Sequence, residues 1–227
     1  VHPVSLRLPT ILFGILGVIA LYLLAKEMFS WEIAALSSFL MAISFWHVNF
    51  SRIAASGILA VTIFTFCLYF LWKGLKGKHF FNYFFSGLFL GLGFYSYTAF
   101  RIAPFIIALG LLAYWYFLKK DFGGEEYSHS RDFLTRGVVL LLVTAAIVAL
   151  PLAAYFWMHP AEFSQQMNPV ESLRILFKNI GQTLAMFNFK GDYDWRHNFS
   201  GRPTLLWPVG LLFVFGLVRR IAKFFKQ

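Results

Sequence analysis

A short polar segment, His47 to Ser56, lies between two long apolar runs and contains Arg52. A charged side chain so close to hydrocarbon is costly, and it is usually kept where an anionic or polar group receives it. A guanidinium can donate two parallel hydrogen bonds to one phosphate. Arg52 is therefore a candidate ligand for the phosphate of a lipid. Its alternative role is structural, with the guanidinium reaching out to lipid headgroups as an anchor.

A second polar segment, Tyr95 to Arg101, lies between two later apolar runs. Pro104 suits the first turn of the helix that follows, so Arg101 lies close to a helix N-terminus, where peptide dipoles also favour an anion. Both segments carry polar side chains that a simple anchor does not need. The residues predicted to bind substrate beside the two arginines are His47, Asn49, Tyr95 and Tyr97. For His47, an interfacial polar role is the alternative.

The late segment from Asn188 to Pro203 is dense in groups that bind sugars, phosphates and metals. Two of its carboxylates are two positions apart, which fits an oxygen-rich cation site or a site that orients a sugar. A solvated acidic turn is the alternative for the carboxylates, and a structural loop latch is the alternative for the residues after them. No cofactor is required, and a divalent cation remains open. The candidate substrate-binding residues here are Asp192, Asp194, Arg196, His197 and Asn198.

The composition indicates the elements that must position these residues. Hydrophobic residues make up 59% of the 227, charged residues 13%, and the mean hydropathy is +0.67. Soluble domains are about half apolar and a quarter charged, so we predict a polytopic membrane protein. Its fold class is all-α, a transmembrane bundle of about seven helices in one domain, 1–227, with an extracytoplasmic loop region, 158–203, that contains short amphipathic helices. The seven apolar runs are 9–25, 31–46, 57–72, 80–98, 102–118, 137–157 and 204–218.

The charge distribution predicts the topology of this bundle. A net charge of +10 raises the question of nucleic acid, but the charges are scattered over the ends of the runs and form no basic stripe. If residue 1 starts outside, most of the Lys and Arg lie on inside connections, as the positive-inside rule requires. Arg52 and Arg101 then face the outside. The predicted inside segments are Lys26 to Trp31, Lys73 to His79, Lys119 to Arg136 and Arg219 onward.

Four further features of the sequence bear on packing and function. Ser86 to Gly93 places small residues four positions apart, which predicts close contact with another helix. Asp121 to Ser130 is rich in glycine and charge and is expected to be a loop. The only cysteine, Cys67, lies in the middle of a run and is expected to be a buried thiol. No run carries Asp, Glu or Lys at its middle, as an ion-coupled transporter usually would.

The chain resembles the C-type membrane glycosyltransferases of the dolichyl-phosphate-mannose protein mannosyltransferase and aminoarabinose transferase kind. Ser5 to Gly14 resembles the start of the family's second helix, and His47 to Arg52 the segment after its third. Tyr95 to Pro104 resembles a Tyr/Arg/Pro turn of some bacterial and archaeal members, and Asp192 to Pro203 a late loop. The resemblance spans nearly all of the chain through short motifs.

This resemblance implies an enzyme of the plasma membrane that transfers a sugar from a polyprenyl-phosphate donor to an acceptor protein, lipid or glycan at the outer face. The reaction is an inverting displacement with a carboxylate base. The resemblance puts that base before Val1, so the chain is expected to contain no catalytic residue and to be inactive alone. The chain departs from many members of this family near Gly57, where those members carry an acidic residue that helps to hold a metal.

Other functions remain open on the same residues. A non-catalytic binder or flippase of lipid-linked saccharides would use the two arginines to hold a pyrophosphate. A polymerase of surface polysaccharide is another enzyme class that fits. The partners expected in every case are membrane lipids and a polyprenyl-linked sugar, and nucleic acid is not among them.

Overall fold

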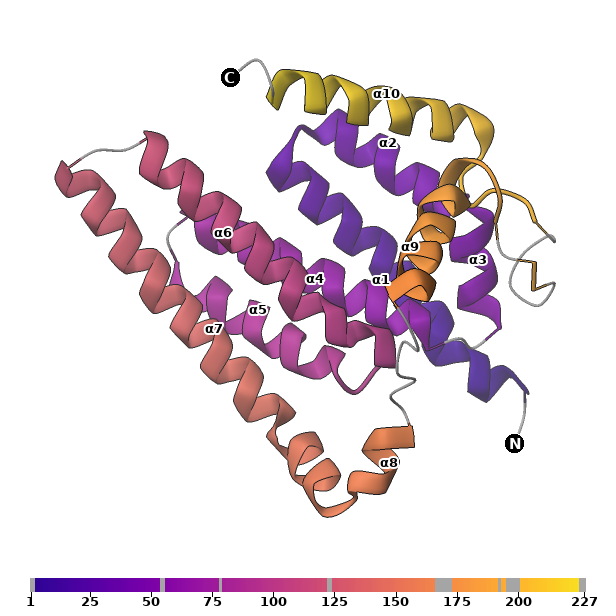
Figure 1. Cartoon of the computed structure of the whole chain (residues 1–227), viewed down its shortest axis with the longest axis horizontal. Coiled ribbons are helices and arrows are strands. Elements are labelled where there is room, and N and C mark those ends of the chain that lie inside the picture. Colours follow the sequence, from indigo (N-terminus) through magenta and orange to yellow (C-terminus); the bar gives the residue numbers. More distant parts are fainter. Residues whose placement is uncertain are drawn as a thin grey trace. The chain divides into compact units, whose positions relative to one another are not determined.

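The computed structural model describes residues 3–53, 56–77, 79–121, 124–165, 173–191, 193–194 and 201–224. All regular elements within these ranges are helices, which confirms the predicted all-α class. The helices (Figure 1) belong to two compact units. Unit 1 consists of Val1–Ile43 and Phe50–Gln166, and unit 2 consists of Ser44–Asn49 and Met167–Gln227.

Unit 1 is an antiparallel helical bundle. Cys67 and Ser86 share a hydrogen bond at mid-helix, and Gly74 lies against Tyr83, so α4 and α5 run in opposite directions. α1 packs against α2 and α4, and α5 packs between α4 and α7. The elements are α1 (Pro3–Met28), α2 (Trp31–Ala42), α4 (Gly57–Gly77), α5 (Phe80–Gly93), the 3-10 helix η1 (Thr98–Ile102), α6 (Ala103–Asp121), α7 (Gly124–Met158) and α8 (Pro160–Gln165).

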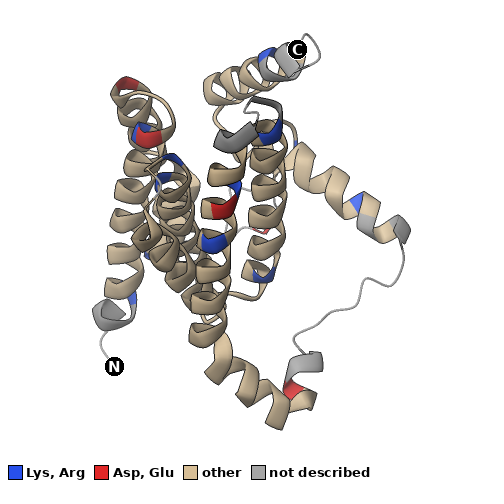
Figure 2. Cartoon of the chain, turned by 90° about the vertical axis from the view of Figure 1, so that its left-hand side faces the viewer, with Lys and Arg blue, Asp and Glu red and all other residues tan. Residues whose placement is uncertain are grey.

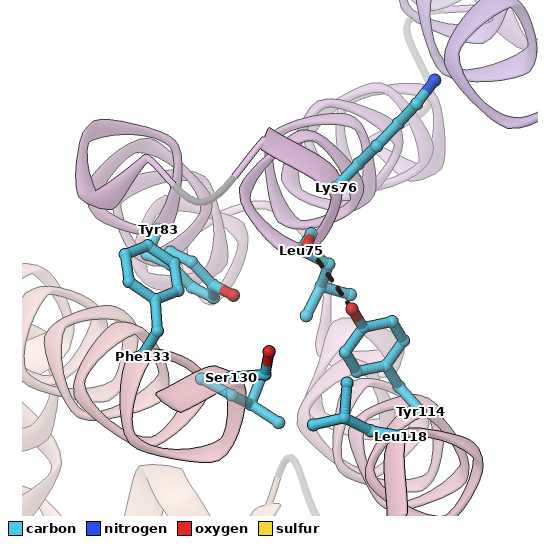
Figure 3. Close-up of a pocket in the computed structure, with 8 residues that line it drawn as sticks. Leu75, Lys76, Tyr83, Tyr114, Leu118, Ser130 and Phe133 are labelled. Carbon is cyan, nitrogen blue, oxygen red and sulfur yellow. Dashed lines mark hydrogen bonds between the residues drawn. The ribbon is translucent and has the colours of Figure 1, made fainter. Parts of the chain in front are cut away.

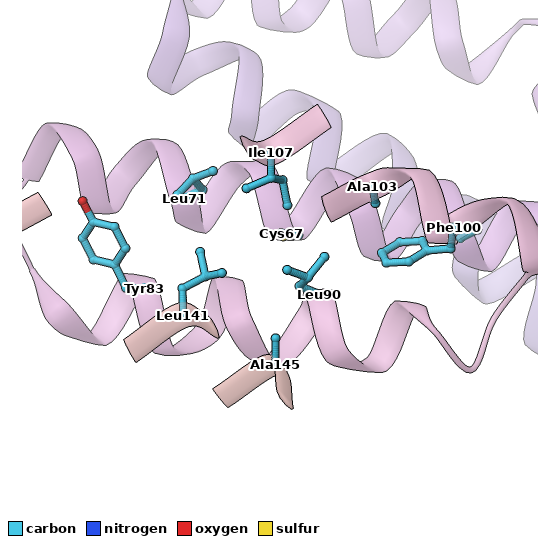
Figure 4. Packing of buried hydrophobic residues seen from close by; sticks show 10 residues of the cluster. Cys67, Leu71, Tyr83, Leu90, Phe100, Ala103, Ile107, Leu141 and Ala145 are labelled. Atoms are coloured by element: carbon cyan, nitrogen blue, oxygen red, sulfur yellow. The ribbon is translucent and has the colours of Figure 1, made fainter. Parts of the chain in front are cut away.

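The buried core of unit 1 lies between α4, α5, α6 and α7 (Figure 4). Aromatic rings fill much of the space around it, for example the stacked Phe70 and Phe89, whose centroids are 5.6 Å apart. The side chain of Cys67 is 0% exposed, and its Sγ lies 3.4 Å from Ser86 Oγ. The predicted buried thiol is therefore confirmed. The core members are Ala60, Cys67, Leu71, Tyr83, Leu90, Phe100, Ala103, Ile107, Leu141 and Ala145.

The small residues of α5 bring its backbone against α7. A Cβ atom at Gly87 would overlap the carbonyl oxygen of Leu141, and one at Gly91 would lie 2.8 Å from the carbonyl oxygen of Ala145. Only glycine allows so close an approach between two helix backbones. The packing role predicted for Ser86 to Gly93 is thus confirmed.

Among the residues that the structure describes, four stretches are long and apolar enough to cross a membrane: Arg7–Met28, Gly57–Gly77, Thr98–Lys119 and Tyr127–Met158. Large apolar side chains along these stretches are exposed, and long parts of the ribbon carry no charged residue (Figure 2). The chain is therefore an integral membrane protein. A fifth span would join α2 to α3 (Phe45–Arg52) across a short break.

The seven predicted runs all occur as helices, but they do not all have the length of a span. α2 has 12 residues and α5 has 14, whereas a straight crossing takes about 20. The polar segment around Arg52 is not a simple turn, because residues 45–52 form α3. Helix formation satisfies backbone groups internally where water is scarce, which explains why this polar sequence is helical.

The prediction of a loop over Asp121 to Ser130 is wrong for most of this segment. α6 continues to Asp121, and α7 begins at Gly124 and runs for 35 residues. Its first turns contain glutamates, and glutamate is a good helix former. The apolar run 137–157 thus predicted only the second part of this helix.

Unit 2 contains α9 (Leu173–Asn188), α10 (Trp207–Phe224) and the first part of α3. α9 presents apolar side chains at helical spacing, and Phe177, Ile180 and Leu184 are all exposed. α8 and α9 confirm short helices within 158–203, and α9 is amphipathic as predicted. Its extracytoplasmic location and the single domain 1–227 remain predictions.

Candidate functional site

Arg52 and Arg101 lie at the same end of unit 1. Arg52 is the last residue of α3, shortly before α4 begins, and Arg101 lies in η1 after α5 ends. Because α4 and α5 are antiparallel neighbours, the start of one lies beside the end of the other. We call this end of unit 1, with Arg52, Tyr95 and Arg101, the arginine end.

The backbone next to Arg52 is fixed to α1. Thr10 Oγ1 lies 3.0 Å from the carbonyl oxygen of Ser51 and donates a buried hydrogen bond to it. Thr62 Oγ1 likewise donates to the carbonyl oxygen of Phe13 at 2.8 Å and holds the first turns of α4 against α1. The Arg52 side chain itself is exposed. A fixed backbone and an exposed guanidinium are what a ligand-binding arginine requires.

Phe100 anchors the turn that carries Arg101. Its ring is 4% exposed and packs edge-on against Phe64, with ring centroids 6.0 Å apart. The ring also fills the space beside Gly93, where a Cβ atom would overlap it. η1 therefore cannot shift without moving a buried aromatic ring, so the packing of Phe100 fixes the backbone position of Arg101.

Arg101 lies between this anchor and the end of α7. Its guanidinium carbon is 6.0 Å from the centroid of the Phe156 ring, at the limit of a cation–π contact. α6 begins at Ala103, so Arg101 comes just before a helix N-terminus and Pro104 lies in the first turn, as predicted. The dipole of α6 and the guanidinium both favour an anion at this position.

The two tyrosines of the turn are placed differently. Tyr95 donates a hydrogen bond to the carbonyl oxygen of Val148 at 2.9 Å, which ties the turn to α7. Tyr97 precedes η1, and its ring is 48% exposed. Tyr95 thus has a structural contact that the sequence did not indicate, while both rings remain exposed enough to meet a substrate.

The remaining candidate residues belong to unit 2. His47 and Asn49 are half-buried on α3, and Asp194 is half-buried in the loop after α9. Hydrogen bonds from Thr204 N to Met186 O at 2.9 Å and from Gly191 N to Gly201 O at 3.2 Å close the base of this loop. Asp192, Arg196, His197 and Asn198 lie outside the described residues. Their predicted roles remain predictions.

Among the residues that the structure describes, no three His, Cys, Asp or Glu side chains gather as a metal site would require. The predicted pair Asp192 and Asp194 is described only in part, so the cation question rests on residues that the structure does not place.

Sequence reasoning missed the groups that support the arginines. Phe156 is more than fifty residues from Arg101 in sequence, and no local pattern links the two. Gly93 carries a local signal, because it is the last of the small residues between Ser86 and Gly93 and stands just before the polar turn.

Residues 1–157 match the family model described as dolichyl-phosphate-mannose-protein mannosyltransferase. No curated protein matches the chain. No solved structure matches it either.

Proposed function

Because the chain belongs to the dolichyl-phosphate-mannose-protein mannosyltransferase family, and is thus a membrane glycosyltransferase with a lipid-linked sugar donor, we propose that its donor is a polyprenyl-phosphate sugar. The acceptor, a protein, lipid or glycan, receives the sugar at the outer face of the membrane. The family match over 1–157 carries this proposal. Two arginines at one end of unit 1, the end that contains the family-like segments, support it.

The reaction we propose is a single inverting displacement. An acceptor oxygen attacks the anomeric carbon, the bond between that carbon and the phosphate oxygen breaks, and polyprenyl phosphate leaves with the electron pair. A carboxylate takes the proton of the acceptor. We place that carboxylate before Val1, as the resemblance implies, so the tests below use the complete gene product.

In this scheme Arg52 and Arg101 bind the phosphate that becomes the leaving group. Charge builds up on the leaving phosphate as the bond breaks, and preorganised donors aimed at developing charge are an effective source of catalysis. Tyr97 would contact the sugar or the acceptor. The substrate-binding roles of His47, Asn49 and Asp194 in unit 2 stay predictions from the sequence. A divalent cation at the Asp192 loop is compatible with this proposal and is not required by it.

A transfer assay tests the donor class. The purified complete protein in liposomes is given radiolabelled polyprenyl-phosphate mannose or a nucleotide-linked mannose, with membrane extract from its own source as acceptor. We expect label transfer and release of polyprenyl phosphate with the first donor only, and inversion at the anomeric carbon of the product. Transfer from the nucleotide sugar would contradict the proposal, and so would tight binding of the polyprenyl donor without turnover for any sugar offered.

The orientation of the arginine end has a separate test. In intact cells, a maleimide that cannot cross membranes should label Ser56→Cys, whereas His129→Cys should be labelled only after permeabilisation. Both positions are exposed, and they lie at opposite ends of unit 1. The native protein is the control, because Cys67 is 0% exposed and should remain unlabelled. The reverse pattern would place the arginines inside and overturn the outer-face assignment.

A further inference from the structure

Unit 1 contains a cavity at the end opposite to the arginines. We call this end, with Glu27, Lys76, Lys119 and Arg131, the lysine end. The cavity has a volume of about 220 Å³ and lies between α4, α5, α6 and α7 (Figure 3). Its walls combine apolar side chains with polar ones, and hydroxyl groups from three helices face the space. The lining residues are Leu75, Lys76, Tyr83, Tyr114, Leu118, Ser130, Phe133 and Leu134.

Tyr83 is the most informative of these residues. Its side chain is 1% exposed, and its ring is wedged beside Gly74 and Gly137, where Cβ atoms would lie 3.0 and 2.7 Å from ring carbons. Its hydroxyl points into the cavity (Figure 3). Within the described part of the chain this hydroxyl has no hydrogen-bonding partner. The hydroxyl is open to the cavity, so a group bound there can accept its hydrogen.

Two further hydroxyl groups lie beside the cavity. Tyr114 donates a hydrogen bond to the carbonyl oxygen of Leu75 at a long 3.4 Å, and its oxygen lies beside the cavity. Ser130 is 7% exposed, and its hydroxyl faces the same space. The lining contains no carboxylate. Hydroxyl groups in a lining without carboxylates suit the oxygen atoms of an anionic ligand.

Basic residues flank the cavity on three helices. Lys76, Lys119 and Arg131 lie next to the lining residues Leu75, Leu118 and Ser130 in sequence, and all three are exposed. Lys76 pairs with Glu27 at 3.7 Å, and Arg131 pairs with Asp132 at 3.2 Å. Exposed ion pairs of this kind are weak, so an arriving phosphate can compete for the cations.

We propose that this cavity binds the phosphate headgroup of an anionic phospholipid from the leaflet that meets the lysine end. A volume of about 220 Å³ is below the roughly 300–1,000 Å³ of pockets that enclose a drug-sized ligand, so it suits a headgroup and not a whole lipid. Basic pockets between transmembrane helices on the positively charged side of a bundle are known binding places for such headgroups. The site is separate from the donor site proposed at the arginine end.

Bound there, the lipid would join α6 to its neighbours. α6 contacts the rest of the bundle much less than α5 contacts α4 and α7. A headgroup held by Tyr83 on α5, Tyr114 on α6 and Ser130 on α7 would connect three helices through one ligand. The binding should therefore stabilise the folded bundle.

The test is native mass spectrometry of the complete protein titrated with phosphatidylglycerol or phosphatidylcholine. Tyr83→Phe removes the hydroxyl and keeps the buried ring, so it should fold like the native protein. The matched control is Tyr116→Phe, on α6 near the lysine end, with a 61% exposed ring that does not line the cavity. We expect phosphatidylglycerol to bind the native protein and the control equally, and Tyr83→Phe to weaken it about tenfold, as for one hydrogen bond to a charged group.

Several results would overturn this inference. One is equal phosphatidylglycerol affinity in Tyr83→Phe and Tyr116→Phe, and another is equal binding of phosphatidylcholine, which would remove the preference for an anionic lipid. Displacement of the lipid by soluble glycerol phosphate would show a site for free phosphate esters instead. Retention of neither lipid would mean that water alone fills the cavity. Tyr83→Phe could lower lipid binding simply by destabilising the protein, which would show as a melting temperature below that of Tyr116→Phe without lipid. In that case Lys119→Ala is measured instead of Tyr83→Phe. An unchanged affinity of Lys119→Ala for phosphatidylglycerol would equally contradict the proposal.

Discussion

Arg52→Ala and Arg101→Ala should each lower the rate of sugar transfer by the complete protein by roughly 30- to 1000-fold, which corresponds to about 2–4 kcal/mol. The physical reason is the charge that the leaving phosphate acquires as the sugar–oxygen bond breaks. A guanidinium already in position stabilises the transition state more than the ground state, so the loss should appear in kcat as well as in kcat/KM.

Lysine at either position should restore little of the rate. An ammonium keeps the charge but cannot donate two parallel hydrogen bonds to one phosphate. The measurement is single-turnover transfer from polyprenyl-phosphate mannose by Arg52→Ala, Arg52→Lys, Arg101→Ala and Arg101→Lys at equal folded yield. Arg7→Ala is the matched control, since Arg7 is an exposed arginine near the same end of unit 1. Near-native rates in both alanine variants would return Arg52 and Arg101 to the role of headgroup anchors.

The order of the helices explains why the sequence could predict that the arginines share one end. Arg52 precedes one apolar run and Arg101 follows the next, and two successive antiparallel helices place such positions side by side. The alternation of apolar runs and short connections was sufficient to predict that the two arginines lie at one end. Gly87 and Gly91 could also be interpreted from spacing alone, because small residues four positions apart lie on one helix face.

The supporting contacts could not be predicted in this way. The bond from Tyr95 to Val148 and the approach of Arg101 to Phe156 join positions more than fifty residues apart, and nothing in the local sequence marks either partner. The α3 helix was missed because polar residues interrupt its apolar ones, and continuous apolar runs were taken as the markers of helices. The first part of α7 was missed for the same reason.

The cavity shows a similar limit. Tyr83, Tyr114 and Ser130 come from three helices, and each alone would pass for an ordinary residue near a helix end. They can be recognised as a group only in the structure, where α5, α6 and α7 place three hydroxyls around one space (Figure 3).

For the polar groups of unit 2, the sequence predicted a loop rich in candidate ligands, and the structure adds the hydrogen bonds that close its base.

Gly87→Ala should destabilise the protein by about 1–3 kcal/mol, the usual cost of extra volume in a packed interface. The added methyl group would overlap the carbonyl oxygen of Leu141 and would lie 2.9 Å from the Cβ atom of Thr144. A backbone carbonyl in a helix cannot rotate away as a side chain can, so α5 and α7 must separate and lose contact along their length.

Gly110→Ala is the control, because Gly110 lies on α6 with nothing within 4 Å of the added atom. It should be neutral or slightly stabilising, since alanine is favoured over glycine in a helix by about 1 kcal/mol. Cys67 supplies the measurement: a thiol-reactive fluorogenic dye reaches this single buried cysteine only when the bundle opens. We expect the melting temperature of Gly87→Ala in detergent to fall well below those of the native protein and Gly110→Ala. Equal melting of the two variants would show that α5 and α7 are not held in contact at Gly87.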